Sequence, residues 1–171
     1  MVPKEGREHM VSEFVGSREL IDVLLIEDSA SYSRLIQETF REVNAHVNFH
    51  VVNDGLEAMA FLKRKGKANA DTPRPDLILL DLGMPKMDGR EVLAWLKQDR
   101  DLRTIPTIVL TTSQMQGDID SCYDNHANSY LQKPLELGQL DTLMKSINDF
   151  WFNRATPPGQ HLAKTPKSES S

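Results

Sequence analysis

The chain has 171 residues, 39% of them hydrophobic and 26% charged, a balance typical of a folded globular protein rather than a disordered one. Its 20 basic and 25 acidic side chains give a net charge of −5, which argues against a general nucleic-acid binder, and no apolar run reaches the length of a membrane span. The single cysteine excludes an intramolecular disulfide and a cysteine-based zinc cluster, so we expect a cytoplasmic protein without a secretory leader.

Short apolar runs alternate with amphipathic segments along the chain. The short runs lack polar alternation, as in strands that are buried on both faces of a parallel sheet, and they predict strands at 20–26, 49–52, 77–80, 107–110 and 129–131. Helical spacing of apolar residues predicts helices at about 32–43, 56–63, 89–96, 117–125 and 137–152. This order predicts an α/β protein in which helices cover both faces of a parallel sheet.

Three segments are expected: an N-terminal extension (1–19), one folded domain (20–153) and a polar, flexible tail (154–171). Ser29 or Ser31 can cap the first helix. In the second helix, Leu56, Met59 and Leu62 or Lys63 are expected to face inward.

The last predicted helix ends in three consecutive aromatic residues. Its apolar stripe, which ends at Trp151, should face the sheet, so Phe150 and Phe152 point elsewhere. Large aromatic side chains exposed together are uncommon on a monomer, and the strand at 129–131 is expected at the sheet edge beside them. We therefore expect a homodimer through this region. The alternative is that the aromatics fold back and shield residues 10–14.

Polar side chains follow the ends of four predicted strands. Glu27 and Asp28 follow the first strand, Asp81 follows the third, Thr111 ends the fourth, and Lys133 follows the fifth. The carboxyl ends of parallel strands meet at one edge of the sheet, which is where open α/β sheets bind ligands. The sequence therefore predicts a single site that contains all five side chains.

Three carboxylates in one crevice repel one another and need a cation to remain ionised together. An all-oxygen donor set favours a hard cation, Mg²⁺ before Ca²⁺. We expect Asp28 and Asp81 to be direct ligands and Glu27 to hold metal-bound waters. The backbone carbonyl of Gly83 is a further candidate ligand.

The predicted site is also suited to phosphoryl transfer. A carboxylate beside Mg²⁺ can attack phosphorus and form an aspartyl-phosphate, while the metal offsets charge on the phosphoryl group. Lys133 would pair with Asp81 at rest and with a phosphoryl oxygen afterwards. The Thr111 hydroxyl would donate to a second phosphoryl oxygen.

Together with the segment 81–89, Tyr130 and Lys133-Pro134, these residues resemble a response-regulator receiver domain of the two-component systems. The resemblance covers about residues 21–151. It implies a flavodoxin-like (βα)5 three-layer sandwich with strand order 2-1-3-4-5. It also implies that Asp81 is the phospho-acceptor, that Thr111 and Tyr130 are the switch residues, and that a sensor histidine kinase is the phosphodonor.

A narrower resemblance is to the small single-domain regulators paired with bacterial phytochromes. It is carried by the segments 73–76, 88–93, 111–113, 133–137 and 150–151. It implies a phytochrome histidine kinase as partner and a homodimeric, stand-alone regulator. Nucleic acids, membranes and small-molecule substrates other than phosphodonors are not expected as partners.

Two other functions compete with this signalling switch, which we expect not to be an enzyme. A phosphatase of the haloacid-dehalogenase type needs a second Asp two residues after the nucleophile, where this chain has Gly83. A flavodoxin-like cofactor binder needs a phosphate-cradling loop after the first strand, where Glu27 and Asp28 would repel a phosphate.

Overall fold

A computed structural model describes residues 20–66 and 69–158 of the chain, so the predicted 1–19 extension and most of the predicted tail lie outside the described residues. The strands form one parallel sheet in the order β2-β1-β3-β4-β5, which confirms the predicted topology. They are β1 (Ile21–Ile26), β2 (Val47–Val52), β3 (Leu77–Leu80), β4 (Thr107–Thr111) and β5 (Ser129–Gln132).

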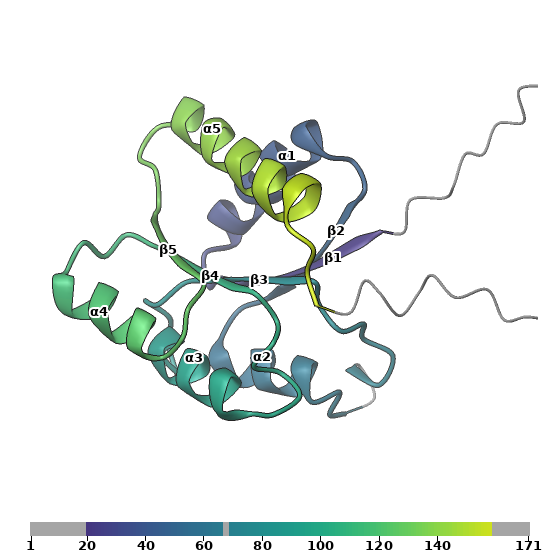
Figure 1. Cartoon of the computed structure of the whole chain (residues 1–171), viewed down its shortest axis with the longest axis vertical. Coiled ribbons are helices and arrows are strands. Elements are labelled where there is room, and N and C mark those ends of the chain that lie inside the picture. The colour runs from purple at the N-terminus through teal and green to yellow at the C-terminus, as the bar shows by residue number, and fades with distance from the viewer. Residues whose placement is uncertain (1–19, 67–68, 159–171) are drawn as a thin grey trace, which may run out of the picture.

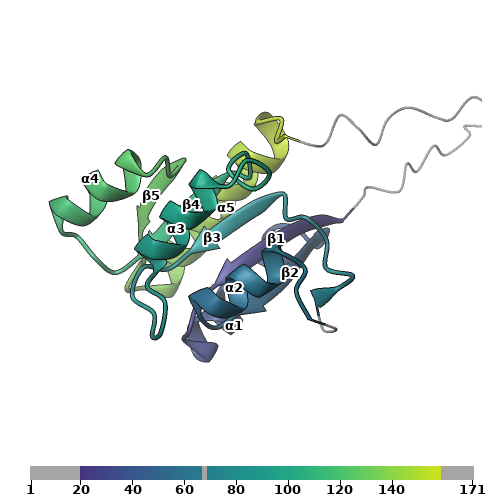
Figure 2. The same cartoon turned by 90° about the horizontal axis from the view of Figure 1, so that it is seen from below.

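Helices cover both faces of the sheet. Helices α1 (Ala30–Val43) and α5 (Leu137–Asn148) lie on one face, and α2 (Gly55–Leu62), α3 (Gly89–Gln98) and α4 (Gln116–Asp124) lie on the other (Figures 1 and 2). Successive side chains of a strand point to opposite faces of the sheet, so a strand that is apolar throughout contributes side chains to two separate cores. In β3, Leu77 and Leu79 join the core beneath α1 and α5, and Ile78 and Leu80 join the other. Among the described residues, no helix is long and apolar enough to cross a membrane.

Polar side chains cap three of the helices that follow strands. The Ser29 side chain accepts a hydrogen bond from the Tyr32 backbone N–H at the start of α1, which decides between the two predicted caps. Asp54 caps α2, and Asp88 caps α3 as part of a capping box with Glu91. Each cap determines the residue at which its loop ends and its helix begins.

The predicted inward face of α2 is wrong at Leu56 and Met59, whereas Leu62 is partly buried against the core as predicted. Leu56 is 56% exposed and Met59 is half-buried, whereas the buried positions are Gly55, Ala58 and Phe61. The loop before α3 determines this rotation, because a Cβ at Gly55 would lie only 2.6 Å from the Cβ of Met87. The helix therefore packs with Gly55 against that loop, and helical spacing then places Ala58 and Phe61 on the same buried face.

The chain after α5 continues as a π-helix (Asp149–Arg154) rather than as the α-helix predicted to residue 152. Hydrogen bonds from residue i to i+5, such as Ala155 N–H to the Phe150 carbonyl at 2.7 Å, widen the turn. This winding brings Phe152 onto the core side, where its ring meets Phe40 edge to face at a centroid distance of 6.0 Å. The expectation that Phe152 points away from the domain is therefore wrong, whereas Phe150 is 54% exposed.

Candidate functional site

The carboxyl-terminal edge of the sheet brings the predicted acidic residues together. Glu27 and Asp28 follow β1, and Asp81 follows β3, the neighbouring strand. One carboxylate oxygen from each of these three residues lies within 4.8 Å of the other two. Glu27 and Asp81 are buried and Asp28 is exposed, so the cluster has a closed base and an open mouth.

Lys133, which follows β5, reaches across the end of the sheet to two of these carboxylates. Its Nζ lies 3.0 Å from Asp81 Oδ2 and 2.5 Å from Glu27 Oε2. Its backbone N–H donates to the Thr111 carbonyl at 2.8 Å, so β4 holds the base of the side chain in place. The Lys133 side chain is only 10% exposed, and its ion pairs are therefore weakly screened by water.

The charges in the site do not balance, because three carboxylates face one ammonium group. Burial raises the pKa of the Glu27 carboxyl above its ordinary value, although Lys133 and the backbone N–H of Ser29 both favour the ionised form. An oxygen-only donor set with excess negative charge fits a hard divalent cation. The residues present are therefore suited to hold Mg²⁺.

The loop after β3 folds back onto the strand end and holds Asp81 in place. The Gly89 N–H donates to the Leu82 carbonyl at 3.0 Å, and a Cβ at Gly89 would lie 2.1 Å from the Asp81 carbonyl oxygen. Gly83 directly follows this turn and is exposed, and its N–H lies 3.4 Å from Asp81 Oδ1. Only a residue without a side chain fits at position 89, so the position of Asp81 depends on that glycine.

Thr111 and Tyr130 are connected through Ser113, on the loop between β4 and α4. The buried Thr111 Oγ1 accepts from the Ser113 N–H at 3.4 Å, and the Tyr130 hydroxyl donates to the Ser113 carbonyl at 2.9 Å. The Ser113 hydroxyl donates to Asp118 Oδ2 at 2.5 Å, and Arg90 pairs with the same carboxylate. A change at Thr111 can therefore reach β5 and α4 through one loop residue.

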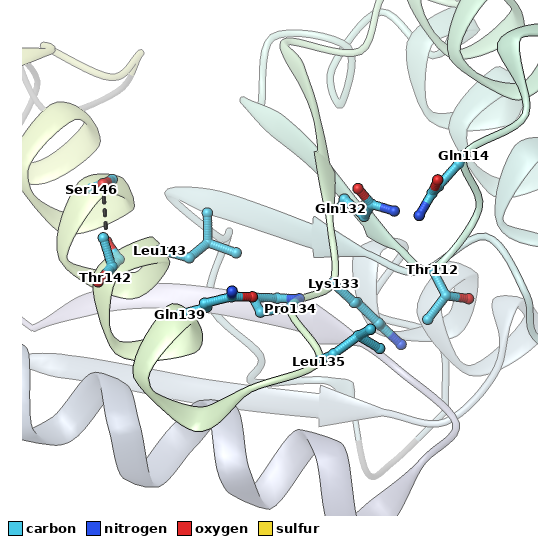
Figure 3. A pocket seen from close by; sticks show the side chains of 10 residues that line it. All are labelled: Thr112, Gln114, Gln132, Lys133, Pro134, Leu135, Gln139, Thr142, Leu143 and Ser146. Carbon is cyan, nitrogen blue, oxygen red and sulfur yellow. Dashed lines mark hydrogen bonds between the residues drawn. The ribbon is translucent and has the colours of Figure 1, made fainter.

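A cavity of about 450 Å³ lies beside the site, between β5 and α5. Figure 3 shows Thr142, Leu143 and Ser146 on the α5 side of this cavity and Gln132 and Gln114 opposite them. Lys133 also lines the cavity.

One residue of the site was missed by sequence reasoning. The helical spacing of apolar residues in α1 predicts that Tyr32 belongs to its buried stripe, and its ring does pack partly against that core. The ring also lies over Lys133, with Nζ 4.5 Å from its centroid. The sequence could not show the contact with Lys133, because an aromatic residue at this position fits the apolar spacing of the helix whether or not it also reaches the site.

Comparisons with known proteins give one family. The model of the response regulator receiver domain matches residues 23–145. Response regulator Rcp1 of Synechocystis sp. is 46% identical over 136 residues, which cover 80% of this chain and 92% of that protein. The crystal structure of the Mn²⁺-bound form of Rcp1 superposes with a TM-score of 0.76 at 45% identity, over 81% of this chain and 99% of that chain. The phosphorylated cyanobacterial phytochrome response regulator RcpA gives a TM-score of 0.77 with the same identity and coverage.

Proposed function

The chain belongs to the response-regulator receiver domain family, and on that basis we propose that it is a signalling switch that accepts a phosphoryl group on Asp81. The observation that carries the proposal is the set of contacts around this carboxylate. Lys133 Nζ lies 3.0 Å from Asp81 Oδ2, and oxygens of two further carboxylates lie within 4.8 Å. Incubation with Mg²⁺ and acetyl phosphate should give an acid-stable, base-labile phosphoryl adduct detectable by intact mass, and a chain that gains no phosphoryl mass contradicts the proposal.

In the proposed transfer, an Asp81 carboxylate oxygen attacks the phosphorus of a phosphohistidine. The new O–P bond forms as the N–P bond breaks, and the electron pair returns to the imidazole nitrogen of the donor. Lys133 needs little movement to bind a phosphoryl oxygen, because its ammonium group already lies against Asp81. The Thr111 hydroxyl is proposed to donate to a second phosphoryl oxygen.

We propose Mg²⁺ as the metal, with Asp28 and Asp81 as direct ligands, the Gly83 carbonyl as a further ligand and Glu27 holding bound waters. When bound, the cation supplies positive charge that offsets the charge of the phosphoryl group. The exposed carboxylate at the mouth of the site, Asp28, is the ligand that can be changed with least effect on packing.

Removing a residue that only supports a metal ligand typically weakens metal binding roughly 10- to 100-fold. Asp28→Ala removes a proposed ligand itself, so we expect it to weaken Mg²⁺ binding by at least that factor. Loss of a direct anionic ligand removes both an oxygen donor and a unit of charge. Metal titration followed by NMR or tryptophan fluorescence measures the affinity. Asp101→Ala is a suitable control, because Asp101 is an exposed carboxylate that precedes β4, at the other edge of the sheet. Equal affinities for Asp28→Ala and wild type would contradict the ligand assignment.

A sensor histidine kinase is the proposed phosphodonor, and a phytochrome is the proposed type of kinase. Support comes from the 46% identity to Rcp1 and from the structural similarity to a regulator described as a phytochrome response regulator. We propose the cytoplasm as the compartment of this chain. Phosphoryl transfer from a phytochrome kinase should be faster than transfer from an unrelated kinase, and equal rates would count against the pairing.

Thr111 and Tyr130 are proposed to act as a coupled switch. If the Thr111 hydroxyl turns toward the phosphoryl group, its contact with the Ser113 N–H is lost and the Ser113 carbonyl no longer holds the Tyr130 hydroxyl in the same place. Phosphorylation should therefore shift the NMR signals of the Tyr130 ring in wild type. In Thr111→Val, which keeps the shape and lacks the hydroxyl, the shift should be absent or much smaller. Identical shifts in both proteins would contradict the proposed coupling between Thr111 and Tyr130.

A homodimer through β5 and α5 is the proposed assembly. The residues of α5 that line the cavity recur at helical spacing and lead to the exposed Phe150; they are Gln139, Thr142, Leu143 and Ser146. Strand β5 beside them is the last strand of the sheet, so one of its edges is unpaired. Sedimentation at micromolar concentration should show a dimer that Phe150→Ala weakens. Phe152→Ala should instead lower domain stability, because its ring packs on Phe40. A wild-type chain that is monomeric both with and without phosphate excludes this assembly.

A further inference from the structure

The Tyr32 hydroxyl is buried and has no hydrogen-bond partner. It is the single such side-chain atom in the described part of the chain. A buried donor without an acceptor costs free energy, and in a folded protein it is uncommon enough to require a reason. The ring alone would serve the core equally well, so the hydroxyl is the feature to explain.

The surroundings of Tyr32 place its ring at the edge of the carboxylate cluster. Lys133 Nζ lies 4.5 Å from the centre of the Tyr32 ring, a distance typical of a cation–π contact. The same Nζ lies 3.0 Å from Asp81 Oδ2 and 2.5 Å from Glu27 Oε2. The ammonium group therefore contacts the ring and both carboxylates at once.

The hydroxyl is a proton donor over the whole neutral pH range. Burial, and next the negative charges of Glu27 and Asp81, raise the pKa of Tyr32 to about 12. The Tyr32 hydroxyl has no hydrogen-bond partner in the free protein, so it can donate to an anionic acceptor that enters the site.

We infer that Tyr32 binds the phosphorylated site: its hydroxyl donates a hydrogen bond to a phosphoryl oxygen carried by Asp81. This inference rests on the function proposed above. A phosphoryl group brings three strong acceptor oxygens to the position where the free protein offers the hydroxyl none. Because the bond is absent before phosphorylation and present afterwards, it stabilises the phosphorylated state relative to the free state.

The Tyr32 ring and hydroxyl have separable roles. The ring contacts Lys133 in the free protein, and Tyr32→Phe keeps that contact while it removes the donor. Loss of an unpartnered buried hydroxyl should leave the stability of the free protein unchanged or higher. Loss of a hydrogen bond to a charged phosphoryl group should weaken the phosphorylated state. These opposite effects distinguish a ligand-binding hydroxyl from a merely structural one.

The test uses beryllium trifluoride, a tetrahedral analogue that attaches to a carboxylate oxygen, with the full chain at saturating Mg²⁺. Tyr32→Phe should bind the analogue roughly tenfold more weakly than wild type. Its melting temperature without the analogue should equal or exceed that of wild type. Thr72→Val is the control, because the Thr72 hydroxyl donates to the Phe61 and Asn69 carbonyls in the loop before β3, away from the site, and its loss should not affect the analogue.

Equal analogue affinities for Tyr32→Phe and wild type overturn the inference and leave the proposed function intact. A lower melting temperature for free Tyr32→Phe also overturns it, because the hydroxyl would then stabilise the unphosphorylated fold. If wild type binds neither the analogue nor a phosphoryl group, the proposed function and the inference both fail.

Discussion

Asp81→Asn is expected to abolish the phosphoryl adduct that the wild-type chain forms with acetyl phosphate and Mg²⁺. The amide has the shape of the carboxylate but no anionic oxygen to attack phosphorus. The fold should persist, because Lys133 keeps its contact with Glu27 at 2.5 Å and the repulsion between carboxylates is reduced. Intact mass before and after incubation measures the adduct, and circular dichroism confirms that the variant is folded.

A second buried aspartate provides the matched control for this prediction. Asp54 follows β2, is 4% exposed, and pairs with Lys86 at 2.8 Å rather than with Lys133. Asp54→Asn keeps a capping side chain at the start of α2 and should form the adduct at close to the wild-type level. If Asp81→Asn gains phosphoryl mass at the wild-type rate, the acceptor lies elsewhere and the proposed function has to be reassigned.

Gly89→Ala should destabilise the domain more than alanine at any other glycine in the described part of the chain. The new Cβ would lie 2.1 Å from the Asp81 carbonyl oxygen and 2.7 Å from the Leu82 Cα. These are backbone atoms, which cannot rotate away as a flexible side chain can, so α3 and the loop after β3 must separate. We expect unfolding to become easier by about 3 kcal/mol or more, at the upper end of the cost of overpacking.

Chemical denaturation of Gly89→Ala measures this loss, and the phosphoryl adduct should form more slowly because the backbone of Asp81 is displaced. Gly138→Ala is the matched control, since Gly138 lies in the first turn of α5 with no neighbouring atom within 4 Å of a new Cβ. That substitution should leave stability unchanged or raise it by up to about 1 kcal/mol through helix propensity. Equal stabilities for the two variants would show that the β3–α3 loop is looser than its contacts indicate.

Local patterns were sufficient for a parallel sheet with helices on both faces and for the charged centre of the candidate site, whereas the strand order was expected only from the family resemblance. Apolar runs such as β3 carry no alternation, since both of their faces are buried, and this alone indicates a sheet covered on both sides. In a parallel sheet, the residues that follow such runs must meet at one edge. Glu27, Asp81 and Lys133 could therefore be grouped from their positions in the sequence, and the structure brings them into contact.

Contacts between distant segments decided the rest. The rotation of α2 depends on how closely Gly55 approaches Met87, and the position of Phe152 depends on a π-helical turn that packs it against Phe40. The clearest case is Tyr32, whose spacing within α1 predicts a core residue and nothing more. Its buried hydroxyl without a partner, and its ring over the ammonium group of Lys133 from the far strand β5, appear only in the packed structure. Periodicity reports which face of an element is buried, but hydrogen-bond satisfaction depends on atoms from several elements and exists only once they are packed together.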